Sequence, residues 1–228
     1  MRDNWTTAVA TPRLLLLPYR RAFVPVYHAW MADPHLLEST CSERLTLPEE
    51  LAAQRAWVDD PRKCTFLLFD RAQHLAAARP LASTPAGMLG DANLFLLAPD
   101  AVAEDYFGGA APAAPAAEVM VMVAEPAHRR KGYAAEAVAA LLRYGAEALG
   151  LRRFVAKVGE GNAASLALFA RLGFSVARRV AAFEEVHLVW EWAGAGAGAG
   201  GGAGYEVLPC AWGAAEEDAE AAAAGAAA

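Results

Sequence analysis

The stretch EVMVMVAEPAHRRKGYA, residues 118–134, decides how the rest of the chain is interpreted. Alternating valine and methionine at 119–123 predict a short apolar strand, which Pro126 ends because proline has no N–H to give to a neighbouring strand. Arg129, Arg130 and Lys131 follow, at the start of a predicted helix. Positive side chains there add to the free N–H groups and the dipole of the helix, which both favour an anion. The stretch therefore predicts a strand, a phosphate-binding turn and a helix.

Patterns on both sides of this stretch predict a mixed α/β sheet. Helices that join strands suit parallel crossovers, whereas the hairpin-like parts suit antiparallel pairs. Gly90 and Asp91 indicate a bulge or a close approach of backbones within their strand. Thr46 is the expected cap of a helix that ends at 59–61. The other helices are expected at 24–31, 131–149 and 163–172, and the other strands at 13–18, 63–70, 87–97, 153–158, 174–180 and 183–192.

Length and composition predict one domain with low-complexity segments around it. The 228 residues suffice for a single core. We expect a flexible N-terminus at 1–10, a domain at 11–192 with loop insertions at 71–86 and 98–117, and a disordered, acidic Gly/Ala-rich tail at 193–228.

The charge distribution argues against nucleic acid and against an anionic membrane as partners. The net charge is −6, but the tail holds five acidic residues and no Lys or Arg, which leaves 20 basic against 21 acidic residues in 1–192. A nearly neutral body provides no broad basic surface. The cluster at 129–131 is therefore local and suits a small anion.

The cysteines and the N-terminus predict an intracellular protein. Cys41, Cys64 and Cys210 form neither a CxxC pair nor an even framework, so neither zinc nor disulfides are expected. No apolar run approaches the roughly 20 residues of a membrane span, and the first residues lack the apolar core of a signal peptide. We expect a cytoplasmic location, with the nucleus as a second compartment.

With RRKGYA at 129–134 and NAASLALFARLGF at 162–174, the chain resembles the GNAT superfamily of N-acetyltransferases, which share a Q/R-x-x-G-x-G/A turn. Within it, the chain is similar to the N-acetyltransferase 9-like family over about residues 11–192. The motifs that carry this likeness are YHAWM, SERLTLPEE, KCTFLLFD, GDANLFL, EVMVMVAEP, RKGYAAEAV and AKVGEGN. The resemblance implies a GNAT fold, a mostly antiparallel sheet with splayed central strands and flanking helices.

The resemblance also implies acetyl-CoA as cosubstrate, no metal, and a set of site residues. Glu118 would be the general base, since it matches the strand glutamate that some members use. Asn162 would contact the cofactor, although it is as readily a plain helix cap. The pyrophosphate would lie on the turn and the pantetheine arm along the end of the strand, which assigns cofactor contacts to Met122, Val123, Ala124, Arg129, Arg130, Lys131, Gly132, Tyr133 and Ala134.

Two positions depart from the superfamily pattern. Phe169 stands where many members carry a tyrosine that protonates the leaving thiolate, so the acid is left open between Tyr144, a water and no acid at all. Met120 stands where an acidic residue is expected in the nearer family.

The function implied is acetyl transfer to an amine of a protein or peptide, either an α-amine or a lysine, with a cytoskeletal acceptor as one candidate. Two alternatives stay open. The chain could bind acetyl-CoA as an interaction module without catalysis. The second alternative is a dehydrogenase, because GEGNAA at 159–164 matches G-x-G-x-x-A with Glu184 and Glu185 about twenty residues on.

Overall fold

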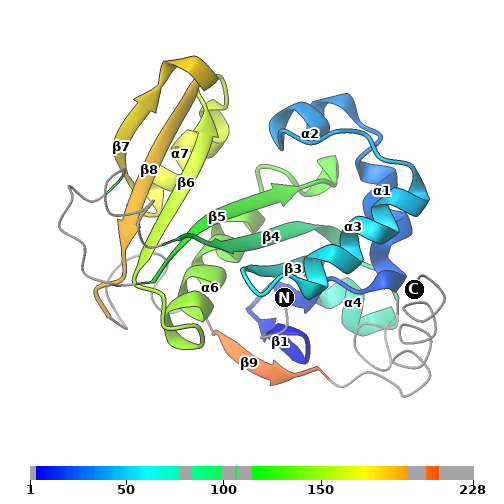
Figure 1. Ribbon diagram of the computed structural model, residues 1–228. Helices are drawn as coiled ribbons and strands as arrows, with labels where there is room; N and C mark the ends of the chain where they lie inside the picture. The colour runs from blue at the N-terminus through cyan, green and yellow to red at the C-terminus, as the bar shows by residue number, and fades with distance from the viewer. Residues whose placement is uncertain (1–3, 78–83, 99–105, 107–114, 195–203, 211–228) are drawn as a thin grey trace.

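The computed structural model describes residues 4–77, 84–98, 106, 115–194 and 204–210. Within these residues the strands form a single sheet in the order β7-β8-β6-β5-β4-β3-β2-β1-β9 (Figure 1). All neighbours are antiparallel except β5 and β6, which are parallel. The strands are β1 Thr7–Ala10, β2 Leu14–Pro18, β3 Lys63–Asp70, β4 Met88–Leu96, β5 Ala116–Val123, β6 Arg153–Gly159, β7 Ser175–Val180, β8 Glu185–Glu191 and β9 Glu206–Pro209.

Helices cover both faces of the sheet, and each face has its own core. On one face, α6 (Tyr133–Glu147) and α7 (Ala163–Arg171) pack on side chains that include Phe66, Leu94 and Phe154. On the other face, Phe23, Tyr27 and Phe69 belong to a second core. The helices of this second face are α1 Val24–Trp30, α2 Pro34–Ser39, α3 Leu47–Asp59 and α4 Arg71–Ala77.

Local sequence explains where the main helices begin. The backbone N–H of Thr46 donates to Glu49 Oε2 at 2.8 Å, which forms the capping box expected before α3. The apolar stripe of α6 includes Val138, Leu141 and Leu142, all completely buried. Residues 131 and 132 lie before α6, so the predicted helix start at Lys131 is two residues early.

The parallel pairing between β5 and β6 ends soon after it starts. Ala116 pairs with Arg153, Ala117 with Phe154 and Glu118 with Val155, and the register stops there. On its other side β5 stays paired with β4 as far as Val123 opposite Gly90. Figure 1 shows β6 turning away from β5 beyond the paired end. The splayed central strands that were expected are present, and we call the opening between them the split.

Gly90 explains how β4 stays so close to β5 beside the split. A Cβ built at position 90 would lie 1.9 Å from the Met122 carbonyl oxygen, which no side chain can tolerate. The register between β3 and β4 also shifts at Leu68/Phe69, opposite this region. The close approach expected at Gly90 and the bulge are therefore both observed.

Four predictions about the less regular segments are wrong. Residues 7–10 are not flexible but form the buried strand β1, paired on both sides. The expected insertion at 71–86 begins with α4, and β5 begins inside the expected loop at 98–117. The tail contributes β9, which pairs with β1. The rest of the predicted tail and insertions lies largely outside the described residues.

Candidate active site

The turn between β5 and α6 is tied to the end of β5 by Arg129. Its Nε donates to the Val123 carbonyl oxygen at 2.9 Å and its Nη2 to that of Ala124 at 2.8 Å. Arg130 and Gly132 adopt left-handed backbone angles, with φ of 62° and 84°, so the chain reverses sharply before Tyr133. Such a turn directs successive N–H groups to one side, which is a typical anion-binding arrangement. The Arg129 side chain anchors the turn, and Arg130 and Lys131 remain as its exposed cations.

Arg13, at the β1–β2 connection, holds the same turn from the other side. Its Nη1 donates to the Lys131 carbonyl oxygen at 2.8 Å and its Nε to Glu136 Oε2 at 2.7 Å. The guanidinium also lies over the Tyr133 ring, 4.9 Å from its centroid. Burial alone would raise the pKa of Glu136, but hydrogen bonds from Thr11 and Arg13 lower it below its ordinary value. Arg13 thus adds a cation beside the turn that the sequence analysis missed.

The end of β5 lies along the split. In a strand, backbone polar groups alternate between the two neighbouring strands. Because the Ala124 N–H donates to Leu89 of β4 at 2.9 Å, the polar groups of Val121 and Val123 face the side that β6 has left. The Met122 side chain is buried on the α1 face. Of the predicted contact residues 122–124, Val123 therefore has its backbone polar groups on the side of the split, whereas the Ala124 N–H is bonded to β4.

Glu118 marks the apex of the split and forms an ion pair. Its Oε2 lies 2.7 Å from Nζ of Lys157 on β6, and the two side chains are 15 % and 33 % exposed. Burial would lower the pKa of Lys157, but the hydrogen bond and the charge of Glu118 raise it above its ordinary value. Glu118 is therefore a paired and largely buried carboxylate.

A further polar cluster lies next to Lys157 on the same face. His187, on β8, is paired directly with Lys157 in the register. Arg178 Nε donates to its Nδ1 at 3.2 Å, so its Nε2 carries the proton that is donated to Glu185 Oε2 at 2.9 Å. The Tyr106 hydroxyl also lies 3.0 Å from His187 Nδ1. Of these residues the sequence had indicated only Glu185, as part of the match to the dinucleotide fingerprint.

The other predicted residues lie away from the split or serve the helices. Asn162 Oδ1 accepts from the Ser165 N–H at 3.0 Å, so the structure shows its capping role. Phe169 is buried against Phe174, with ring centroids 5.0 Å apart. Tyr144 lies eleven residues along α6 from Tyr133, about 16 Å at 1.5 Å per residue. It is thus remote from the turn.

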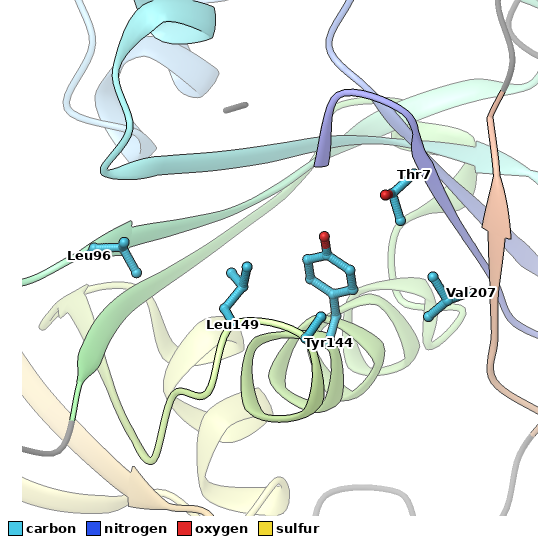
Figure 2. Close-up of a pocket in the computed structure, with 6 residues that line it drawn as sticks. Thr7, Leu96, Tyr144, Leu149 and Val207 are labelled. Atoms are coloured by element: carbon cyan, nitrogen blue, oxygen red, sulfur yellow. The ribbon is translucent and has the colours of Figure 1, made fainter. Parts of the chain in front are cut away.

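Tyr144 instead lines a hollow of about 530 Å³ between α6, β4, β1 and β9. In Figure 2 its hydroxyl points between Leu149 of the segment after α6 and Thr7 of β1, with Val207 beyond. This hollow is at the opposite end of α6 from the anion-binding turn.

Asp91 is a fully buried carboxyl next to β5. It pairs with Met122 in the register, and its Oδ2 accepts from Tyr27 at 3.2 Å and from Asn93 at 3.1 Å. Burial raises its pKa to about 6, which the two hydrogen bonds offset only in part. The sequence pattern had indicated Gly90 and Asp91 for their backbone and not for this buried charge.

The described residues contain no group of three or more His, Cys, Asp or Glu side chains placed to hold a metal ion. Nor does any helix among them have the length and apolar character needed to cross a membrane.

The fold and the split define an acetyltransferase. The family model described as Acetyltransferase (GNAT) domain matches residues 13–175. Two solved structures share the fold at a TM-score of 0.60: spermidine N-acetyltransferase from Vibrio cholerae in complex with CoA and spermine, and a ribosomal α-N-protein acetyltransferase. Their sequences are 15 % and 16 % identical to this chain, respectively. The alignments span 78 % and 80 % of this chain, and 95 % and 92 % of the two solved chains.

Curated relatives show to which family within the GNAT acetyltransferases the chain is similar. The N-acetyltransferase 9-like protein of Nematostella vectensis is 36 % identical over 191 residues, which are 84 % of this chain and 89 % of the relative. Alpha/beta-tubulin-N-acetyltransferase 9 of Homo sapiens is 40 % identical over 189 residues, 82 % of this chain and 84 % of the relative. The chain belongs to the GNAT acetyltransferases, and within them to the N-acetyltransferase 9-like family.

The protein is thus an acetyl-CoA-dependent N-acetyltransferase. The dehydrogenase alternative is wrong, and the topology gives the reason. A dinucleotide fingerprint requires a strand, a helix and a parallel neighbouring strand. Here the strand after α7 is β7, which pairs antiparallel with β8 and not with β6.

Proposed function

We propose that the chain transfers an acetyl group from acetyl-CoA to an amine of a protein, and that tubulin is an acceptor. The observation that carries this proposal is the split, which starts after the Glu118–Val155 pair and leaves backbone of β5 facing an opening. The names of the human and Drosophila melanogaster relatives, both alpha/beta-tubulin-N-acetyltransferase 9, support tubulin as the first acceptor to test.

In this proposal the turn binds the pyrophosphate. Backbone N–H groups of residues 129–134 would bind its oxygens, and Gly132 would leave room for the approach because it has no side chain. Arg130, Lys131 and Arg13 would supply positive charge. Asn162 would contact the cofactor through the part of its side chain that does not cap α7.

The pantetheine arm would run along β5 at residues 122–124, as a strand in the opening. An arm that starts at the turn and follows β5 points its acyl end toward the apex, where Glu118 lies. The Val123 N–H, aimed into the split, would stabilise the oxyanion.

The transfer would proceed by direct attack. The amine nitrogen forms a bond to the thioester carbon, the carbon–sulfur bond breaks, and CoA leaves as a thiolate. Glu118 would accept the proton that the amine loses. Because five residues, about 17 Å of strand, separate Glu118 from Val123, that proton would travel along a chain of several water molecules. Phe169 has no proton to give, so water would also protonate the thiolate.

Mass spectrometry of tubulin and of peptides incubated with acetyl-CoA and the protein tests the proposal. Tubulin acetylated on an α-amine or a lysine supports it, and the modified atom distinguishes the two. Glu118→Gln should lower kcat by about 100-fold, the usual contribution of a general base. Unmodified tubulin beside an acetylated control peptide would rule out tubulin and retain the transfer. A turnover number and pH profile unchanged in Glu118→Gln would remove Glu118 as the base.

A cytoplasmic location is part of the proposal. It is supported by the cysteines of the sequence, since Cys41, Cys64 and Cys210 form neither a CxxC pair nor an even framework. Imaging of the tagged protein tests it, and a mainly nuclear signal would contradict it.

A further inference from the structure

The ion pair between Glu118 and Lys157 spans the split at its apex. Glu118 belongs to the last backbone pair between β5 and β6, and Lys157 is two residues beyond that pair on β6. The ammonium therefore crosses from one splayed strand to the other, over a contact of 2.7 Å. It is placed where the two strands have just separated.

Lys157 faces the side of the sheet opposite α6 and α7. Phe154, Ala156 and Val158 belong to the core under those helices, and side chains alternate along a strand, so Lys157 points the other way. Glu118 points the same way because it contacts Lys157. The charged and titratable groups that face this pair come from β8, β7 and residue 106: Glu185, His187, Arg178 and Tyr106.

The pair places a fixed positive charge beside the proposed base. Lysine is ordinarily charged at neutral pH, and Glu118 raises the pKa of the Lys157 ammonium further. Glu185 adds to the same effect. An acceptor amine that approaches Glu118 must therefore come near a cation that is already bound there.

We propose that Lys157 is a positioning residue for acetyl transfer: its ammonium fixes the Glu118 carboxylate at the apex of the split, and its charge favours the neutral, nucleophilic form of the acceptor amine. This inference rests on the proposed function. A neighbouring cation disfavours the protonated form of an amine. This effect extends the active protonation state of the acceptor to lower pH.

The pH dependence of kcat/KM for Lys157→Met tests the inference, with tubulin as acceptor. Methionine keeps the length and apolar body of the side chain and removes its charge. We expect the ascending limb of the profile to move up by about one pH unit, which is a tenfold loss on the limb in addition to the smaller, pH-independent loss that a less firmly held Glu118 causes on the plateau. Lys157→Arg should restore most of the wild-type profile. Arg55→Gln, which removes a cation from the exposed Arg55–Asp59 pair on α3, should leave the profile in place.

A loss of activity in Lys157→Met that is the same at every pH would overturn the proposal, because it would show that Lys157 only stabilises the local structure.

A second measurement does not depend on turnover. The protein is trace-labelled with acetic anhydride at a series of pH values, and mass spectrometry quantifies the label at Lys63, Lys131 and Lys157. In Glu118→Gln, Lys157 should become reactive at a lower pH than in the wild type, whereas the reactivity of Lys63 should not change.

The two proposals fail in different ways. Identical labelling of Lys157 in the wild type and in Glu118→Gln would show that the pair does not form in solution, and it would overturn only the role of Lys157. A wild-type protein that acetylates no acceptor would overturn both.

Discussion

Single residues in this protein show how burial and charge are balanced around the site. Asp91 is a carboxyl with 3 % of its surface exposed, held by one phenol and one amide. Its pKa, raised to about 6, means that the folded protein binds a proton more tightly than the unfolded chain. Folding is therefore favoured at low pH and loses stability as pH rises from about 4 through 6.

Asp91→Asn should remove this loss, since the amide stays neutral. We compare the free energy of unfolding of the variant with that of the wild type at each pH. This difference should shift in favour of the variant by about 2 kcal/mol between pH 4.5 and pH 8. The wild type has already lost part of the stabilisation at pH 4.5, so the shift is smaller than the whole effect. Urea unfolding at pH 4.5, 6 and 8 measures this. Asp59→Asn, at an exposed position on α3, is the control. A difference from the wild type that does not change with pH would contradict the prediction.

Arg13 links the β1–β2 connection to the turn before α6 and to α6 itself. Arg13→Ala removes its bonds to the Lys131 carbonyl and to Glu136, so the turn is held less firmly and loses a nearby cation. We expect the KM for acetyl-CoA to rise about tenfold with little change in kcat, a modest effect because the side chain is half exposed. Steady-state kinetics measure it. Arg62→Gln, which removes a mostly exposed cation, is the control. An unchanged KM for acetyl-CoA in Arg13→Ala would show that Arg13 does not hold the turn for cofactor binding.

At the scale of elements, the contact between β4 and β5 depends on a missing side chain. Gly90→Ala would place a Cβ against the Met122 carbonyl oxygen, backbone against backbone, so the two strands must separate. We expect a loss of at least about 3 kcal/mol in the free energy of unfolding, at the upper end for overpacking. Gly159→Ala is the matched control, because a Cβ there meets nothing within 4 Å. Equal stability of the two variants in urea would contradict this account.

The long elements could be predicted because their patterns are long. β3 was expected at 63–70 and lies at Lys63–Asp70, and α7 differs from its expected range by one residue. β1 and β9 have four residues each, too few for a period to be recognised, and they are strands because they pair with each other.

The residues of the candidate site also divide into those that could be predicted from the sequence and those that could not. The turn at 129–134 was visible because its residues are contiguous in sequence. Arg13, Lys157 and His187 come from segments that are distant in sequence. Each of them reaches its partner, Lys131, Glu118 and Lys157 respectively, only when the chain has folded. A single positive or aromatic residue in a strand carries no signal of the partner it will meet.

At the scale of the whole molecule, β9 covers the edge of the sheet farthest from the split. Leu208 packs on the second core, and Cys210 is 1 % exposed. A chain that ends at Gly194 would uncover β1 and the apolar surface under it. Since β9 and the split are separated by β1 to β4, the chemistry should not depend on β9 directly.

We therefore expect the shortened chain to lose about 2 kcal/mol of stability, and thus about 4–8 °C in Tm, while its kcat at 20 °C stays within about twofold of the full chain. A chain that ends at Cys210 is the control and should behave as the full protein. Calorimetry and kinetics on the two truncations measure both effects. An unchanged Tm would show that β9 adds little to the fold, and a lost kcat would show that the tail reaches the site.

The split has a consequence for amide hydrogen exchange. Where β6 leaves β5, the sheet has an edge in its interior, and the amides of Val121 and Val123 face that edge. In the free protein they should exchange with solvent much faster than the amide of Met122, which faces β4. When acetyl-CoA fills the opening, protection of these two amides should rise while that of Met122 stays constant. Alternate residues of a single strand would thus report whether the cosubstrate completes the sheet.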